Sequence, residues 1–470
     1  MDRPANGAAA APANPAAPAT PAGTNPVSTR RAVLNTIRGS LGNLVEWYDV
    51  YVYTVFAKYF EAHFFGGDEP NAGIYTMAIF AVTFLMRPIG SWFFGRFADR
   101  HGRRPALVAS VSLMALASLA IAVAPTAASI GSGAVVVLVL CRLVQGFATG
   151  GEYGTSATYM SEAATPERRG FFSSFQYVTL VGGHVLAQCM LLLQQAVLTD
   201  EQISDFGWRI AFGFGAVAAV VVLWLRSSMD ESLQRGAAHE SGRSGSMGEL
   251  VKRYPRQLTT CFLVTIGGTL AFYTYSVNGP TTVKAAYAGQ GMTATWVNLA
   301  ALVVLMLLQP VGGAISDRVG RKPLLVFFGV GGLLFSYVFI TTLPDVRSPW
   351  ASFGLLVAAY VVLTGYTSIN AVVKAELFPA HVRALGVGFG YAVGNSLFGG
   401  TAPLLYEAAK KNDAVGTFAI YVTVTIAASL VVYVLALGGR RDATHLDREQ
   451  AARDGRPEAD EELEVADARR

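Results

Sequence analysis

The chain has 470 residues, of which 52% are hydrophobic and 14% are charged, and its mean hydropathy is +0.41. Because a soluble domain carries about 25% charged residues, this composition excludes an ordinary soluble globular protein and indicates a membrane protein. The net charge of +4 is small, and most cations lie between apolar runs. These cations are therefore better interpreted as orientation signals than as a nucleic-acid surface.

Sequence motifs argue against an enzyme. The three cysteines, Cys141, Cys189 and Cys261, have neither metal-ligand spacing nor a disulfide pattern. The chain contains no nucleotide-binding loop and no nucleophile elbow. We expect no enzymatic activity, no cofactor and no metal.

Apolar runs long enough to cross a bilayer recur along the whole chain. The Ala/Pro-rich segment 1–30 precedes them and is expected to be a disordered cytoplasmic tail. The charge-rich segment 439–470 follows them and is expected to be a solvated cytoplasmic tail. The twelve predicted spans are 36–60, 73–97, 105–124, 132–160, 170–196, 207–226, 258–279, 294–315, 323–342, 350–374, 384–408 and 415–437.

The polar stretch 227–257 is the long hydrophilic interruption between spans and divides them into two sets of six. We therefore predict an all-α membrane protein with two pseudo-symmetric six-helix bundles, 31–226 and 258–438, joined by a cytoplasmic linker. An internal repeat supports this division. The motif G-x-x-x-D-R-x-G-R-[RK] occurs at 95–104 and again at 313–322, an offset of 218 residues. Two membrane-embedded halves with the same charged hairpin are typical of a two-lobed transporter.

Lysine and arginine predict the orientation, because cytoplasmic loops are enriched in both. They gather in both repeated hairpins and in the central linker, whereas loops such as 61–71 and 122–133 are poorer in them. An even number of spans then places both termini in the cytoplasm. The expected location is the inner membrane of the cell, with the lipid bilayer as surroundings.

A second repeat follows spans four and ten, where Glu162 and Arg169 correspond to Glu376 and Arg383. We expect these charges and the hairpin charges to form ion pairs that latch the two halves and break when the inner side opens. The predicted gating residues are Asp99, Arg103, Asp317, Arg321, Glu162, Arg169, Glu376 and Arg383.

The paired hairpin motif resembles the inter-helix loop of the major facilitator superfamily. The segment 42–49, GNLVEWYD, looks like the opening of its metabolite:proton symporters, and 84–90 and 142–146 are similar to that family as well. Segments 150–162, 175–180 and 374–379 are most similar to the alpha-ketoglutarate permeases. The resemblance implies the major facilitator fold and proton-coupled transport. His184 and segment 278–280 depart from the pattern of these permeases, which leaves the substrate less certain than the family.

Charged residues within spans are costly and usually functional. Glu46, Asp49 and Tyr53 are spaced to share one helix face. The resemblance implies that Asp49 is the protonatable acid and that Arg142 is its partner in span four. We predict that Asp49, Arg142 and Glu46 serve proton coupling. A static buried pair that fixes helix packing would explain the same residues without coupling.

Arg87 lies deep in span two and offers the fork of donors that matches a carboxylate. We expect it to clamp substrate, unless it pairs with Glu46 or Glu152 instead. Other polar side chains within the spans are candidates for substrate binding, although each is individually more typical of an interhelical contact. These candidates are Tyr53, Gln145, Glu152, Gln176, His184, Tyr273, Asn370, Lys374 and Asn395.

The predicted function is import of a small carboxylate, alpha-ketoglutarate first, with protons by alternating access. Rival interpretations keep the fold and change the substrate to citrate, another dicarboxylate, shikimate or betaine. The same fold would also suit an exchanger or uniporter without proton coupling, or a membrane sensor that uses a transporter fold to report a ligand. A monomer is sufficient for this architecture.

Overall fold

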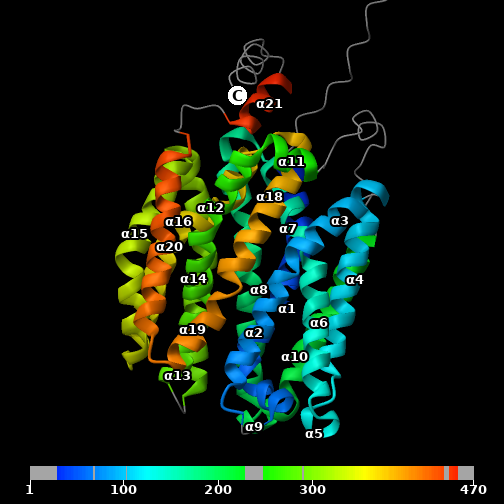
Figure 1. Cartoon of the computed structure of the whole chain (residues 1–470), viewed down its shortest axis with the longest axis vertical. Coiled ribbons are helices and arrows are strands. Elements are labelled where there is room, and N and C mark those ends of the chain that lie inside the picture. The colour runs from blue at the N-terminus through cyan, green and yellow to red at the C-terminus, as the bar shows by residue number, and fades with distance from the viewer. Residues whose placement is uncertain are drawn as a thin grey trace, which may run out of the picture.

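The computed structural model describes residues 29–66, 69–101, 103–162, 164–227, 247–287, 290–438 and 444–453, and every regular element within them is helical (Figure 1). The first half contains α1 (Thr29–Phe65), α2 (Ala72–Leu85), α3 (Arg87–His101), α4 (Arg103–Ala122), α5 (Ala127–Ile130), α6 (Gly133–Thr149), α7 (Glu152–Glu162), η1 (Pro166–Arg168), α8 (Arg169–Val197), α9 (Asp200–Gln202), η2 (Ile203–Gly207) and α10 (Trp208–Ser227).

The second half begins with the short α11 (Met247–Arg253) and ends with a short helix beyond the last long one. Its remaining elements are α12 (Pro255–Tyr273), η3 (Thr274–Asn278), α13 (Gly279–Ala286), α14 (Gly291–Val319), α15 (Arg321–Thr342), η4 (Leu343–Asp345), α16 (Pro349–Thr367), α17 (Asn370–Glu376), α18 (Ala380–Gly394), η5 (Asn395–Gly399), α19 (Ala402–Lys411), α20 (Val415–Leu435) and α21 (His445–Arg453).

The long helices run side by side as a bundle, with α11 and α21 at one end and α5, α9 and α13 at the other (Figure 1). We call these the α21 end and the α9 end. Among the described residues, nine helical stretches are long and apolar enough to cross a membrane. The other three predicted spans correspond to α1, to the shorter apolar α4, and to the interrupted series α18, η5 and α19.

Side-chain exposure fits a bilayer around the bundle. Large apolar residues such as Leu334, at 72% exposed, and Leu435, at 78%, lie on the outer surface. Only a lipid environment makes such a surface favourable, because water would not solvate it. The most buried spans are Pro255–Ala286 and Pro349–Glu376, with 83% and 78% of their apolar windows inside the protein. These two spans therefore line the centre.

Several spans predicted to be continuous are interrupted near their middle. Pro88 lies just after the break between α2 and α3, where its missing N–H weakens the helix. Gly150 and Gly151 separate α6 from α7. π-helical turns interrupt the seventh and eleventh predicted spans at η3 and η5. Such breaks leave backbone groups unsatisfied, so within a membrane they occur where the chain lines a site.

The two halves touch closely near the α21 end, where glycines replace larger residues. A Cβ added to Gly154 on α7 would lie 2.6 Å from the Cα of Gly388 on α18. A Cβ on Gly170 of α8 would lie 2.6 Å from the carbonyl oxygen of Gly313 on α14. Both crossings join a helix of the first half to one of the second. Any larger side chain there would push the halves apart.

The halves also touch toward the α9 end. The hydroxyl of Ser396 on η5 donates to the carbonyl of Phe84 on α2, and the ring of Phe84 packs edge-on against Tyr273 of α12 at 5.3 Å. Lys284 of α13 donates to the carbonyl of Val55 on α1 at 3.5 Å. The centre of the molecule is consequently closed toward both ends.

The charged tail differs from its prediction as a solvated segment. Residues 445–453 form α21, which packs on the α21 end. Thr444 caps the helix, because its hydroxyl accepts from the backbone N–H of Asp447 and its own N–H donates to the Asp447 carboxylate. The helix forms because its acidic residues find buried arginines as partners, which the polar sequence alone did not reveal.

Candidate functional site

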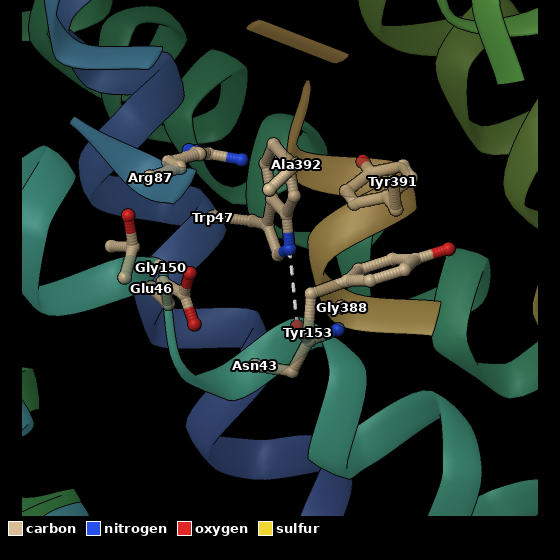
Figure 2. A pocket seen from close by; sticks show the side chains of 10 residues that line it. Asn43, Glu46, Trp47, Arg87, Gly150, Tyr153, Gly388, Tyr391 and Ala392 are labelled. Atoms are coloured by element: carbon tan, nitrogen blue, oxygen red, sulfur yellow. Dashed lines mark hydrogen bonds between the residues drawn. The ribbon is translucent and has the colours of Figure 1, made fainter. Parts of the chain in front are cut away.

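A small enclosed cavity lies between the two halves, at the level of the breaks between α2 and α3 and between α6 and α7 (Figure 2). Its volume is about 10 Å³, which is room for about one water molecule. The first half contributes most of its lining, and α18 closes the other side. The lining residues are Asn43, Glu46, Trp47, Arg87, Thr149, Gly150, Tyr153, Gly388, Tyr391 and Ala392.

Arg87 provides the cationic group of this cavity. Its side chain is 4% exposed, and its guanidinium carbon lies 4.0 Å from the ring centre of Phe84 and 4.9 Å from that of Trp47. The Nε and Nη2 atoms have no hydrogen-bond partner among the residues that the structure describes. Figure 2 shows the guanidinium directed toward the Trp47 indole and the α18 side of the cavity. A buried guanidinium with unused donors is prepared to receive an anion.

The rest of α1 braces the cavity. Asn43 accepts from the Trp47 indole N–H at 3.1 Å, and its amide donates to the Thr179 hydroxyl at 2.6 Å and the Gln176 carbonyl at 3.2 Å, both on α8. These bonds fix the Trp47 ring under Arg87. Glu46 lies on the same wall of the cavity and is 5% exposed.

Asp49 belongs to a separate polar cluster between α1, α4 and α6. It accepts hydrogen bonds from the Ser118 hydroxyl on α4 and from the Gln145 amide on α6, the latter at 2.5 Å. Gln145 accepts from Arg142 at 2.7 Å through its other end. Among the described residues no ion pair joins Asp49 to Arg142, so Gln145 connects them. The predicted direct pair is therefore replaced by an amide bridge.

Glu46, Asp49 and Tyr53 have the spacing of one helix face but contact different neighbours. Glu46 faces the cavity, whereas Asp49 faces α4 and α6. Tyr53 does not line the cavity; its hydroxyl donates to the Thr76 carbonyl at 3.0 Å and its ring lies 4.3 Å from the guanidinium of Arg142. Helical spacing places these three residues close together on α1, but different neighbouring helices pack against them.

Other predicted substrate residues do not line the cavity. Gln176 accepts from Ser156 at 2.9 Å, and its Nε2 has no hydrogen-bond partner in the described part of the chain. His184 stacks on Tyr51 with ring centres 4.1 Å apart. Tyr273 packs against Phe80 and Phe84, which places it beside the cavity near Arg87. Glu152 begins α7, two residues after the lining residue Gly150, and Asn395 begins η5.

Two predicted residues of α17 lie behind a pair of cavity tyrosines. Tyr153 and Tyr391 stack with ring centres 3.5 Å apart and an angle of 12°. Asn370 donates to the Tyr153 hydroxyl at 2.8 Å. Lys374 is fully buried and lies 4.3 Å from the centre of the Tyr391 ring. It neither lines the cavity nor forms an ion pair with any residue that the structure describes.

The predicted gating charges are partly visible. The carboxylate of Asp317 accepts from the backbone N–H groups of Gly170 and Phe171 at 2.7 and 2.9 Å, across the boundary between the halves. Arg321 donates to Asp317 at 2.8 Å and to Glu376 at 3.5 Å. The side chains of Asp99, Arg103 and Glu162 lie outside the described residues.

The arginines related by the second repeat both contact α21. Arg169 donates to Asp447 at 2.5 Å, and Arg383 donates to Glu449 at 2.8 Å. Glu449 also accepts from the backbone N–H of Ala380 at 2.9 Å. A single short helix thus holds one arginine from each half.

Eight of the ten lining residues, among them Asn43, Trp47 and Tyr153, were not predicted as site residues. They carry no charge. The argument that identified Arg87 and Asp49, which is that a buried charge is costly, therefore does not apply to them. One signal was available: Asn43 and Trp47 lie one helical turn apart and flank Glu46. Helical spacing alone could therefore have placed them beside Glu46.

Comparison with known proteins agrees with the division of the chain into two halves. The family described as "Sugar (and other) transporter" matches residues 36–240 and again 227–437, once for each half. The chain belongs to the major facilitator superfamily. It is a multi-pass membrane transporter with the twelve-helix fold of that superfamily, and its relatives are transporters rather than enzymes. This confirms the predicted fold class.

Two relatives and one solved structure show which members of this superfamily the chain is similar to. The alpha-ketoglutarate permease of Escherichia coli (strain K12) is 42% identical over 408 residues, covering 87% of this chain and 94% of the permease. The citrate-proton symporter of Klebsiella pneumoniae is 30% identical over 374 residues, 79% and 84% of the two chains. The xylose transporter XylE from E. coli is similar in structure, with a TM-score of 0.67, 19% identity and coverage of 88% and 99%.

Proposed function

We propose that this protein imports a small dicarboxylate, alpha-ketoglutarate first, together with protons by alternating access. The observation that carries the proposal is Arg87, a buried guanidinium with two unused donor atoms directed into the central cavity. Its planar fork suits a carboxylate. The 42% identical relative is named for alpha-ketoglutarate, which agrees with this chemistry.

The enclosed cavity fits one intermediate of an alternating-access cycle. At about 10 Å³ it is too small for a five-carbon dicarboxylate. Substrate must therefore enter and leave by separation of the halves at one end or the other. In our proposal the gating charges hold the α21 end closed, and this end faces the cytoplasm of an inner-membrane protein with both termini inside. A single chain contains the whole site, so a monomer is sufficient.

Proton coupling is assigned to Asp49, with Gln145 and Arg142 behind it. Asp49 is buried at 2% exposed and accepts two hydrogen bonds that favour its charged form. Protonation would release these bonds and free Gln145. Glu46, which lies in the cavity with Arg87, is proposed to respond to substrate instead. The remaining polar residues around the cavity are proposed to orient the bound anion and to pack the helices.

Protons are needed for a physical reason. Moving one negative charge inward against 100 mV, inside negative, costs about 2.3 kcal/mol. A dianion therefore meets about 4.6 kcal/mol of opposition. One proton leaves net negative charge moving, two make import electroneutral, and three make it electrogenic.

Citrate is the second candidate substrate, because the citrate-proton symporter shares 30% identity. Betaine fits the cavity less well. The aromatic faces of Trp47 and Phe84, which would attract a quaternary ammonium group, already contact Arg87. An exchanger or uniporter would share the cavity but would not respond to a proton gradient.

Uptake of labelled alpha-ketoglutarate into proteoliposomes tests the proposal. We expect accumulation that requires an inward proton gradient and is abolished by a protonophore. Asp49→Asn should lose gradient-driven accumulation and keep counterflow, whereas Ser112→Ala, on the same α4 but outside the Asp49 cluster, should keep both. Uptake that ignores the gradient would contradict proton coupling. Uptake of citrate but not alpha-ketoglutarate would change the substrate.

A further inference from the structure

Lys374 is a buried cation without an ion-pair partner among the described residues. It lies on α17 and is 0% exposed. Its Nζ donates a long hydrogen bond of 3.4 Å to the Tyr366 hydroxyl, and it lies 4.3, 5.7 and 5.8 Å from the ring centres of Tyr391, Tyr153 and Tyr366. Ring faces attract a cation, but they replace a counter-ion poorly when the ammonium is fully buried. The site lacks an anion.

Nearby acids do not supply one. Glu376, two residues further along α17, is engaged by Arg321. No ion pair to Lys374 occurs in the part of the chain that the structure describes. None of the surface of Lys374 is exposed, so bulk water does not solvate its ammonium group. A transient anionic partner would compensate its charge.

The stacked tyrosines separate Lys374 from the central cavity. Tyr153 and Tyr391 line the cavity that holds Arg87, and both lie within 6 Å of Lys374, which does not line it. In Figure 2 the two rings lie together on the side of the cavity opposite Arg87. We call this pair the tyrosine partition. Lys374 is directly behind it.

The stacked rings of the tyrosine partition come apart when the two halves separate. Tyr153 comes from α7 of the first half and Tyr391 from α18 of the second. They meet at the crossing where Gly154 and Gly388 bring the two helices into contact. Opening the α21 end moves α7 away from α18, so the two rings cannot stay stacked. Separation of the rings would bring Lys374 to the edge of the Arg87 cavity.

We propose that Lys374 is a second carboxylate-binding site, which takes the anion from Arg87 as the α21 end opens. Arg87 holds the substrate while the partition is closed, and Lys374 receives a carboxylate group once the rings separate. A dianion then crosses the aromatic partition between two cations rather than without any counter-charge. This inference rests on the proposed carboxylate transport.

Chemical rescue provides the test. In a chain whose three cysteines are replaced by serine, Lys374→Cys in proteoliposomes should reduce alpha-ketoglutarate counterflow at least tenfold. Treatment with aminoethyl methanethiosulfonate rebuilds a side chain with an ammonium group and should restore at least a third of the counterflow. Methyl methanethiosulfonate fills the space without charge and should restore none. Lys410→Cys, an exposed residue of α19, is the matched control and should keep full counterflow throughout.

A binding measurement separates the two sites. Quenching of Trp47, which lies under Arg87, should report alpha-ketoglutarate binding with an affinity within threefold of the parent in Lys374→Met and at least tenfold weaker in Arg87→Gln. Equal rescue by both reagents, or unchanged counterflow in Lys374→Met, would overturn the second site. Failure of the parent chain to bind or transport any carboxylate would instead refute the proposed function on which it rests.

Discussion

The helix α21 offers the sharpest test of how the closed state is held. It joins Arg169 of the first half and Arg383 of the second through Asp447 and Glu449. The double change Asp447→Asn and Glu449→Gln keeps the size of both side chains and removes both charges. We expect it to favour opening of the α21 end.

The size of the effect follows from burial. A hydrogen bond to a charged group contributes about 1.5–3 kcal/mol, whereas an exposed ion pair contributes about 0–1 kcal/mol. Arg169 and Arg383 are buried, but Asp447 is 49% exposed and Glu449 is 26% exposed, so water screens both pairs. We take about 1 kcal/mol for each pair, between these ranges. Together they change the ratio of closed to open molecules by about 30-fold.

Double electron–electron resonance measures that ratio. Spin labels at Arg168, next to α8, and Lys252, on α11, are both exposed and belong to different halves. In nanodiscs, the double variant should transfer population to longer distances. Glu407→Gln is the matched control, because it removes a half-buried acid paired with Lys410 at the α9 end. Identical distance distributions for the parent and the double variant would refute the idea that α21 holds the α21 end closed.

The contact between Asp447 of α21 and Arg169 also has a defined pH dependence. Burial raises the pKa of Asp447, but hydrogen bonds from Thr444 and the charge of Arg169 outweigh it, and the pKa lies below its usual range. A depressed pKa in the closed state stabilises that state above the reference value of about 3.9 and loses this contribution as pH falls through the closed-state value. The distance distribution should therefore be constant between about pH 6 and 8 and shift toward open molecules only in strong acid.

Three further predictions concern the cavity and its walls. Arg87→Lys keeps the charge but loses the planar fork, and uptake of alpha-ketoglutarate should fall more than about tenfold at unchanged thermal stability; retained uptake would mean that Arg87 acts as a point charge. Gln145→Leu breaks the bridge to Asp49 and should reduce the accumulation ratio more than counterflow, which comparison of the two assays checks. Gly154→Ala inserts a methyl group against Gly388 and should destabilise the closed state by about 1–3 kcal/mol, visible as more open molecules in resonance, whereas Gly213→Ala has open space around it and should not.

The fold was largely accessible from sequence because the membrane imposes strong rules. Twelve apolar runs and the repeated hairpin predict the architecture, since only regular helices satisfy backbone groups in lipid. Arg87 and Asp49 were found because burying charge is costly. Their partners were not, because a span pattern states which residues are buried but not which neighbours they meet. Gln145 as a bridge between Asp49 and Arg142 is a tertiary fact of this kind.

The helix α21 shows a second limit. Residues 445–453 are polar, and their composition favours a solvated tail. Their structure depends on two arginines far away in the chain, at the repeat-related positions 169 and 383. Repeat analysis did identify these arginines as a pair and assigned them to a latch. It could not identify the latching acids, because the tail lies outside the repeat.

The separation of Asp49 from Arg87 determines how coupling must work. Protons are assigned to the Asp49 cluster and substrate to the Arg87 cavity, which Asp49 does not line. Two helices contact both places: α1 supplies Trp47 to the cavity and Asp49 to the cluster, and α6 supplies Thr149 to the cavity and Gln145 to the cluster. Protonation of Asp49 would loosen the bond between α1 and α6 and so alter two walls of the cavity at once. Coupling then requires the relative position of α1 and α6 to differ between protonated and unprotonated states. A disulfide that fixes these helices to one another should abolish gradient-driven accumulation while substrate still binds at Arg87, and accumulation that survives this cross-link would rule out the route.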